Sequence, residues 1–152
     1  IKMLKKNIII LSLILFLANC GFTPIYLKNN NLNFSIEQIE YTGDRDLNNF
    51  LKINLDRYKS EKNNNKLFLV GETKYEKNIL SKDGTGKITS YQLEVEVTFI
   101  VKSTKKEIRI FEKKIIDSMD DKFEEARYEK SIKQSFAYSI SNKLISELIV
   151  NP

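Results

Sequence analysis

The sequence predicts an α+β domain, a two-layer sandwich in which two helices pack on one face of a four-stranded, mostly antiparallel sheet. Residues 87–103 alternate apolar and polar side chains at the two-residue period of a half-buried strand. Residues 44–60 and 121–150 instead repeat apolar residues at helical spacing. The element order is then β-α-β-β-β-α, and two amphipathic helices on one sheet face would bury both apolar stripes.

The chain begins with the layout of a secretory signal. Three lysines precede the apolar run IIILSLILFL at residues 8–17, and short side chains separate this run from Cys20. The run has about half of the roughly 20 apolar residues that a membrane-spanning helix needs. We therefore predict that residues 1–19 are a lipoprotein signal peptide, which is removed. The lysines are Lys2, Lys5 and Lys6.

Cys20 is the only Cys in the chain, and its surroundings predict lipidation. Leu17-Ala18-Asn19-Cys20 resembles the bacterial lipobox, although Asn19 stands where Gly, Ala or Ser is usual. In lipobox proteins the thiol receives a diacylglycerol, and the new N-terminus is acylated after cleavage. The alternative is an incidental Cys after a plain signal peptide. A lone Cys has no partner for an internal disulfide, which favours the lipid. Gly21, in place of Asp, resembles the signal for the outer membrane.

Residues 20–32 contain a Pro and an Asn triplet, and we predict that they form a lipidated tether. Residues 33–152 are then a single domain, whose first element is a strand at residues 33–42. The apolar parity changes once within this strand, which predicts a bulge. The two sets are Phe34 with Ile36, and Ile39 with Tyr41.

A helix is predicted from Asp44 to about Ser60. Asp44 is a suitable N-cap because its carboxylate can accept hydrogen bonds from the free N–H groups of the first turn. The apolar residues at helical spacing are Leu47, Phe50, Leu51, Leu55 and Tyr58.

Three strands are predicted next, at residues 66–80, 87–103 and 107–118. The sequence SKDGTG at residues 81–86 is a strong turn signal between the first two. The middle strand has an apolar face and a polar face that is expected to meet solvent. The apolar face is formed by Tyr91, Leu93, Val95, Val97, Phe99 and Val101, and the polar face by Glu94, Glu96 and Thr98.

The last element is predicted to be a long helix at residues 121–150. Asp120 or Asp121 would cap it, and Glu124 and Glu125 suit the positive end of the helix dipole. Its expected apolar stripe consists of Phe123, Ile132, Phe136, Ile140, Leu144 and Leu148.

The composition argues against an enzyme, a metal site and nucleic-acid binding. The chain has no His, the commonest general base and metal ligand. Its formal net charge is +5, but without the three signal lysines the chain has 22 basic and 20 acidic residues, a balance that gives little support for nucleic-acid binding.

Two short motifs are rejected as binding sites. Gly84-Thr85-Gly86-Lys87 lacks the first Gly and the final Ser or Thr of a phosphate loop, and a hairpin tip explains it better. Asp117, Asp120 and Asp121 are explained better by a helix cap than by a cation. We predict no catalytic residues, no metal and no cofactor beyond the acyl groups on Cys20.

Three segments together resemble the alphaproteobacterial form of the lipopolysaccharide-assembly lipoprotein family, LptE. CGFTPIY at residues 20–26 resembles the mature N-terminus of that family. TSYQLEVEVTFIV at residues 89–101 resembles its central strand, and EARYEKSIKQSFAYSISNKLISEL, ending at Leu148, resembles its amphipathic last helix.

This resemblance implies a location, a partner and a ligand. Members of the family sit on the periplasmic face of the outer membrane, plug and help to assemble the β-barrel LptD, and contact lipopolysaccharide. The implied lipopolysaccharide-binding residues are Lys82 and Lys87 at the hairpin tip, with Lys122 or Arg127 near the start of the last helix. Each could bind a lipid phosphate as a charge pair, or could be an ordinary solvated surface charge.

Three alternatives remain open from the sequence. A periplasmic lipid carrier or auxiliary lipoprotein of another envelope transport system would share the signal and the fold class, and would need an apolar cavity. A membrane-bound enzyme would need a cluster of convergent polar groups. A cytoplasmic domain with a false signal is disfavoured by the order of lysines, apolar run and Cys.

Overall fold

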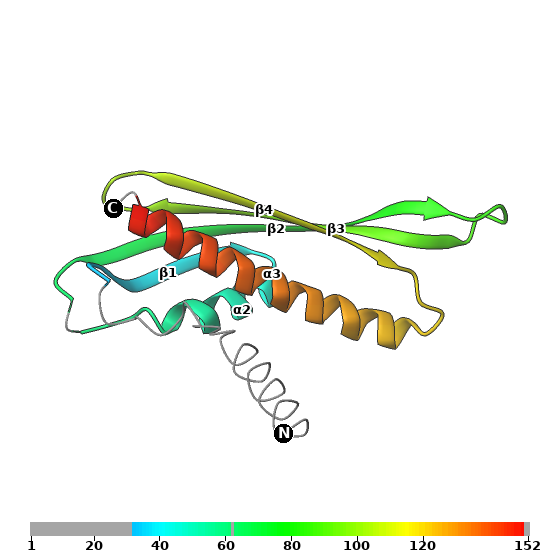
Figure 1. Ribbon diagram of the computed structural model, residues 1–152, viewed down its shortest axis with the longest axis horizontal. Helices are drawn as coiled ribbons and strands as arrows, with labels where there is room; N and C mark the ends of the chain where they lie inside the picture. Colours follow the sequence, from blue (N-terminus) through cyan, green and yellow to red (C-terminus); the bar gives the residue numbers. More distant parts are fainter. Residues whose placement is uncertain (1–31, 62, 151–152) are drawn as a thin grey trace, which may run out of the picture. The chain divides into compact units, whose positions relative to one another are not determined.

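A computed structural model describes residues 32–61 and 63–150 of the chain (Figure 1). The predicted signal peptide, Cys20 and nearly all of the predicted tether lie outside the described residues. The elements are β1 (Ser35–Gly43), α2 (Arg45–Asp56), β2 (Lys66–Lys82), β3 (Ile88–Val101), β4 (Glu107–Asp117) and α3 (Lys122–Val150). This order confirms the predicted β-α-β-β-β-α arrangement.

The four strands form one sheet in the order β1-β2-β3-β4. β1 runs parallel to β2, and the two other pairs are antiparallel, which confirms a mostly antiparallel sheet. The predicted bulge is present as a register shift between Ile36 and Gln38. The parallel pair arises because α2 carries the chain back before β2 begins, as in other strand-helix-strand crossovers.

The core lies between the sheet and the two helices. β3 is a central strand and supplies fully buried side chains at alternate positions, as the sequence predicts. Each such large apolar side chain contributes roughly 1.5–3 kcal/mol on burial. Tyr91, predicted on the same face, is only half-buried because it lies toward the turn that joins β2 to β3. The fully buried residues of β3 are Leu93, Val95, Val97 and Phe99.

The turn from β1 into α2 is built around Gly43 and Asp44. Gly43 has φ +97°, a conformation that favours glycine. The Asp44 carboxylate accepts a hydrogen bond from the Leu47 N–H at 2.8 Å, which confirms Asp44 as the N-cap. The apolar face of α2 then buries Leu47, Leu51 and Leu55, whereas Phe50 and Tyr58 of the predicted stripe are half-buried.

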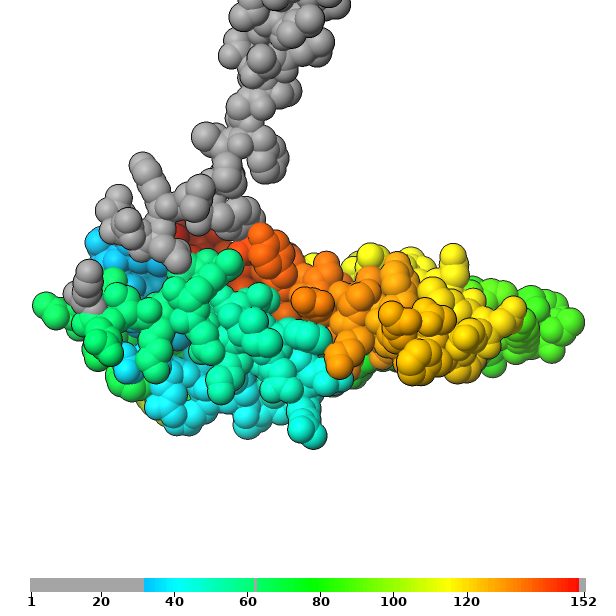
Figure 2. Space-filling view, turned by 90° about the horizontal axis from the view of Figure 1, so that it is seen from below, coloured from blue at the N-terminus to red at the C-terminus, as the bar shows by residue number. Residues whose placement is uncertain are grey.

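β2 and β3 form a long hairpin whose tip extends past the first turns of α3 (Figures 1 and 2). The tip is ordered locally by Asp83, whose carboxylate accepts hydrogen bonds from the N–H groups of Thr85 and Lys87. Gly86 at this turn has φ +87°. We refer to the tip, the residues that join β4 to α3, and the first turns of α3 as the hairpin end of the domain.

The start of α3 differs in one respect from the sequence-based prediction. Asp121 caps the helix by accepting hydrogen bonds from the N–H groups of Phe123 and Glu124. Phe123 is 70% exposed, so its predicted place in the apolar stripe is wrong. The stripe of the first turns instead carries Glu125, which is buried and ion-paired, so the helix dipole alone does not explain this residue. Neither helix in the described residues is long and apolar enough to cross a membrane.

Candidate functional site

The four predicted lipopolysaccharide-binding residues all lie at the hairpin end. Lys82 ends β2 opposite Ile88 and is exposed. Within the described part of the chain no carboxylate lies within 4 Å of its ammonium group. The Lys87 ammonium contacts the Asp120 carboxylate at 2.7 Å, and this contact raises the pKa of Lys87. It joins the hairpin tip to the loop before α3.

The two other predicted residues are also paired. The Lys122 ammonium lies 3.0 Å from the Glu125 carboxylate and donates to the Ser118 hydroxyl. The Arg127 guanidinium lies 3.0 Å from the Glu124 carboxylate across one turn of α3. All three paired cations are mostly exposed, but their partners differ: Asp120 and Glu124 are also exposed, whereas Glu125 is buried. A phosphate that approached Lys87 or Arg127 would therefore compete with a weak, solvent-screened partner.

Beneath these surface charges lies an ion network that the sequence analysis did not find. Its centre is Lys77 of β2, which is three-quarters buried. The Lys77 ammonium contacts the Glu125 carboxylate at 3.0 Å and the Glu129 carboxylate at 2.9 Å, and it lies over the Tyr91 ring. Burial by itself lowers the pKa of Lys77, but the hydrogen bonds to both carboxylates outweigh it and raise this pKa. The ammonium is therefore firmly charged.

Glu125 is the most buried acid of this network, with 5% of its side chain exposed. It accepts hydrogen bonds from the Met119 N–H at 2.9 Å and from the Ser118 hydroxyl at 3.3 Å, besides its two lysines. Burial by itself raises the pKa of Glu125. The hydrogen bonds from Met119, Lys122 and Lys77 outweigh burial and bring the pKa to about 2. One carboxylate thus ties α3, the loop before it and β2 together.

The network continues to the start of α2 through Tyr75. The Tyr75 hydroxyl donates to the Glu129 carboxylate at 2.6 Å, and the Lys133 ammonium lies 3.9 Å from the centre of the Tyr75 ring. Lys133 also contacts the N-cap Asp44 at 2.8 Å. We call this set the stem network. It comprises Asp44, Tyr75, Lys77, Glu125, Glu129 and Lys133.

The stem network is suited to support rather than to catalysis. Each acid in it has a cationic partner within hydrogen-bond distance, so none is a free general acid or base. A signal for it was present in the sequence. Glu125, Glu129 and Lys133 continue the α3 stripe at four-residue spacing, and charged residues at core positions of a helix need buried partners. The spacing in α3 does not show which residues these partners are, because Tyr75 and Lys77 lie on β2, far away in the sequence.

Apolar side chains are also exposed at the hairpin end. Phe123 is the most exposed of them, and the Arg127 guanidinium carbon lies 5.9 Å from the centre of its ring. Ile79 and Leu80 near the end of β2 are about half-exposed. Cations and apolar groups thus share one surface, an arrangement that matches the headgroup region of an amphiphile.

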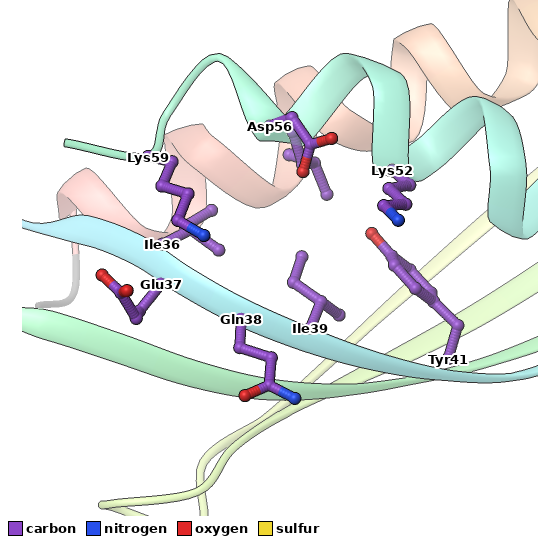
Figure 3. Close-up of a pocket in the computed structure, with 9 residues that line it drawn as sticks. Ile36, Glu37, Gln38, Ile39, Tyr41, Lys52, Asp56 and Lys59 are labelled. Carbon is purple, nitrogen blue, oxygen red and sulfur yellow. The ribbon is translucent and has the colours of Figure 1, made fainter.

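A cavity of 330 Å³ lies elsewhere, between β1 and α2 (Figure 3). Ile36, Ile39 and Leu55 form its apolar part. Tyr41 points from β1 toward α2, on which Lys52 lies (Figure 3). The charged residues around it are Glu37, Lys52, Asp56 and Lys59.

Comparison with known proteins shows the fold alone. No protein-family model and no curated protein matches the sequence. The fold is similar to that of the rare lipoprotein B from Shewanella oneidensis, with a TM-score of 0.55 and 15% identity over 73% of this chain and 92% of that chain. It is also similar to a minor lipoprotein from Acinetobacter baumannii, with a TM-score of 0.50 and 15% identity over 73% of this chain and 94% of that chain.

Proposed function

We propose that this protein is an outer-membrane lipoprotein, anchored through acyl groups on Cys20 at the periplasmic face. In this proposal it plugs and helps to assemble the β-barrel LptD, and it contacts lipopolysaccharide as the lipid passes to the outer leaflet. The observation that carries the proposal is the likeness of fold to a solved lipoprotein over most of that chain, in a sequence whose only Cys follows a signal-like apolar run.

The geometry of the domain supports a lipid contact at the hairpin end. Lys82, Lys87, Lys122 and Arg127 gather there with exposed apolar side chains. The stem network beneath them fixes α3 to the hairpin, so the cations are held on a rigid base. Lipid phosphates bind such cations through charge-assisted hydrogen bonds. A polar outer surface around a packed core also suits the polar lumen of a barrel.

The alternative of a lipid carrier receives less support. A carrier needs an apolar cavity that holds an acyl chain away from water. The cavity between β1 and α2 carries four charged side chains on its lining, which disfavour an acyl chain as its occupant.

The first test is purification of the tagged full-length protein from its native membrane in mild detergent, followed by mass spectrometry. The proposal predicts recovery of a large outer-membrane β-barrel in a ratio near one to one. Recovery of an inner-membrane transporter, or of no partner, would contradict it and favour an auxiliary carrier.

Substitution of Cys20→Ser is expected to abolish labelling of the protein by radioactive palmitate and to release it from the membrane fraction. The reason is that the thiol is the acceptor of the diacylglycerol, and stable anchoring needs more than one acyl chain. The matched control is Asn19→Ala, which places a usual lipobox residue before the Cys and should leave labelling intact. Persistent labelling of Cys20→Ser would refute acylation at this residue.

Charge reversal of Lys82→Glu with Lys87→Glu is expected to weaken lipopolysaccharide binding about tenfold or more, because a charge-assisted hydrogen bond contributes about 1.5–3 kcal/mol. The melting temperature should change little, because both side chains are exposed. The control is Arg45→Glu with Lys105→Glu, which makes the same charge change away from the hairpin end. Equal lipopolysaccharide binding by the two variants would show that Lys82 and Lys87 are ordinary surface charges.

A further inference from the structure

The cavity between β1 and α2 contains an unexplained polar group, the hydroxyl of Tyr41. Among the side-chain nitrogen and oxygen atoms of the described residues, it is the one that is buried without a hydrogen-bond partner. A buried polar group without a partner destabilises the folded domain. Burial raises the pKa of Tyr41, and the nearby Asp56 carboxylate raises it further, so the hydroxyl stays protonated. It is a hydrogen-bond donor and acceptor that the domain itself does not use.

The position of this hydroxyl is set by the sheet beneath it. Tyr41 is the register partner of Gly71 on β2. A Cβ atom at Gly71 would lie 3.0 Å from Cδ1 of the Tyr41 ring. The ring therefore occupies the space that a side chain at position 71 would fill. The ring thus packs against β2 at Gly71, and its hydroxyl is directed to the α2 side, as Figure 3 shows.

The cavity also runs along an unpaired strand edge. In the described part of the chain β1 pairs with β2 alone, so no strand occupies its other edge, and the Ile36 N–H at the start of β1 is bonded to the Tyr58 carbonyl at 3.2 Å. Five of the residues that line the cavity come from β1, namely Ile36, Glu37, Gln38, Ile39 and Tyr41. An open edge beside a cavity is a template for an added strand.

The charges around the cavity favour a peptide over a lipid. Lys52, Asp56 and Lys59 lie along the α2 side and alternate in sign. None of these three has an oppositely charged group within 4 Å among the described residues. An acyl chain would leave these charges and the strand edge without partners, whereas a peptide backbone supplies donors and acceptors to both.

We propose that the cavity between β1 and α2 is a docking site for an extended segment of a partner protein, which adds to the free edge of β1. The segment carries both acidic and basic side chains for the α2 charges, and one of its polar groups bonds to the Tyr41 hydroxyl. Its apolar side chains pack on Ile36, Ile39 and Leu55. This site is separate from the hairpin end and does not depend on the lipid contact proposed there.

The test uses the full-length protein in its native membrane. A photoreactive amino acid replaces Gln38, which is exposed on β1 and lines the cavity, or Lys113, which is exposed on β4 and serves as the control position. After irradiation, the crosslinked peptides are identified by mass spectrometry. We expect position 38 to crosslink one defined segment of one protein, well above the level at position 113.

The second arm repeats the crosslinking with Tyr41→Phe. Loss of one hydrogen bond, about 1 kcal/mol, should reduce the crosslink roughly fivefold. The melting temperature should stay the same or rise, because the buried hydroxyl without a partner is gone. A crosslink to lipid would overturn the proposal, as would an unchanged crosslink in Tyr41→Phe or equal crosslinking at positions 38 and 113.

Discussion

Replacement of Glu125 by Ala is expected to lower the free energy of unfolding of the domain by about 2–3 kcal/mol, because it removes a buried carboxylate that pairs with Lys77 and Lys122 and leaves Lys77 with Glu129 as its remaining carboxylate partner. In this case the substitution would also deprive the Met119 N–H of its acceptor. Urea unfolding of the domain measures the change. Amide hydrogen exchange should increase first in residues 118–131, since Glu125 joins this segment to Lys77 of β2.

Glu124→Ala is the matched control, one residue away on the same turn of α3. Glu124 is half-exposed and pairs only across the surface with Arg127, so its removal should cost less than about 1 kcal/mol. Similar losses from both substitutions would show that the stem network adds nothing beyond surface charge.

The same network predicts a dependence of stability on pH. The pKa of Glu125 in the folded domain is about 2, below its ordinary value. Its contribution is therefore complete above the unfolded-state pKa and disappears as the pH falls from that value to about 2. In Glu125→Gln this part of the stability loss should be absent, because the amide does not titrate.

Gly43→Ala is expected to destabilise the domain by about 3 kcal/mol or more. A Cβ atom at this position would lie 1.8 Å from the Thr73 backbone oxygen, and φ is +97°. The φ strain alone costs about 1–3 kcal/mol, and the collision adds to it. The site is sensitive because the Thr73 hydroxyl accepts from the Asp44 N–H and donates to the Thr42 carbonyl, so displacement of β2 would disturb the start of α2. Thermal unfolding measures the loss.

Substitutions at two other glycines separate the effect of φ strain from the effect of the collision with Thr73. Gly86 also has positive φ, but a Cβ atom there meets nothing within 4 Å, so Gly86→Ala should show the strain without the collision. Gly84 has neither, and Gly84→Ala should be close to neutral. If Gly43→Ala were no worse than Gly86→Ala, the close approach of Gly43 to Thr73 would have no energetic weight.

The local parts of this structure could be predicted from the sequence. The alternation in β3, the helical spacing in α2, the Asp44 cap and the turn around Asp83 all depend on residues within a few positions of one another. Such patterns act through backbone geometry, which is the same in any fold. They also fixed the fold class, because amphipathic helices and a half-buried sheet have few ways to cover one another.

Tertiary structure alone decided which distant charges meet. Phe123 lies nine residues, or about two and a half helical turns, before Ile132, so it faces away from the buried stripe of α3 and stays exposed. Glu125 looks like an ordinary dipole residue until β2 brings Lys77 to it, and Tyr41 looks like a simple core residue until Gly71 sets the direction of its ring. The physical reason is that burial turns a weak surface charge or hydroxyl into one that requires a partner, and burial depends on segments far apart in the chain. The sequence by itself therefore determined the elements and the candidate lipid attachment at Cys20, whereas the fold decided how the hairpin end is supported and where the cavity that we propose as a docking site lies.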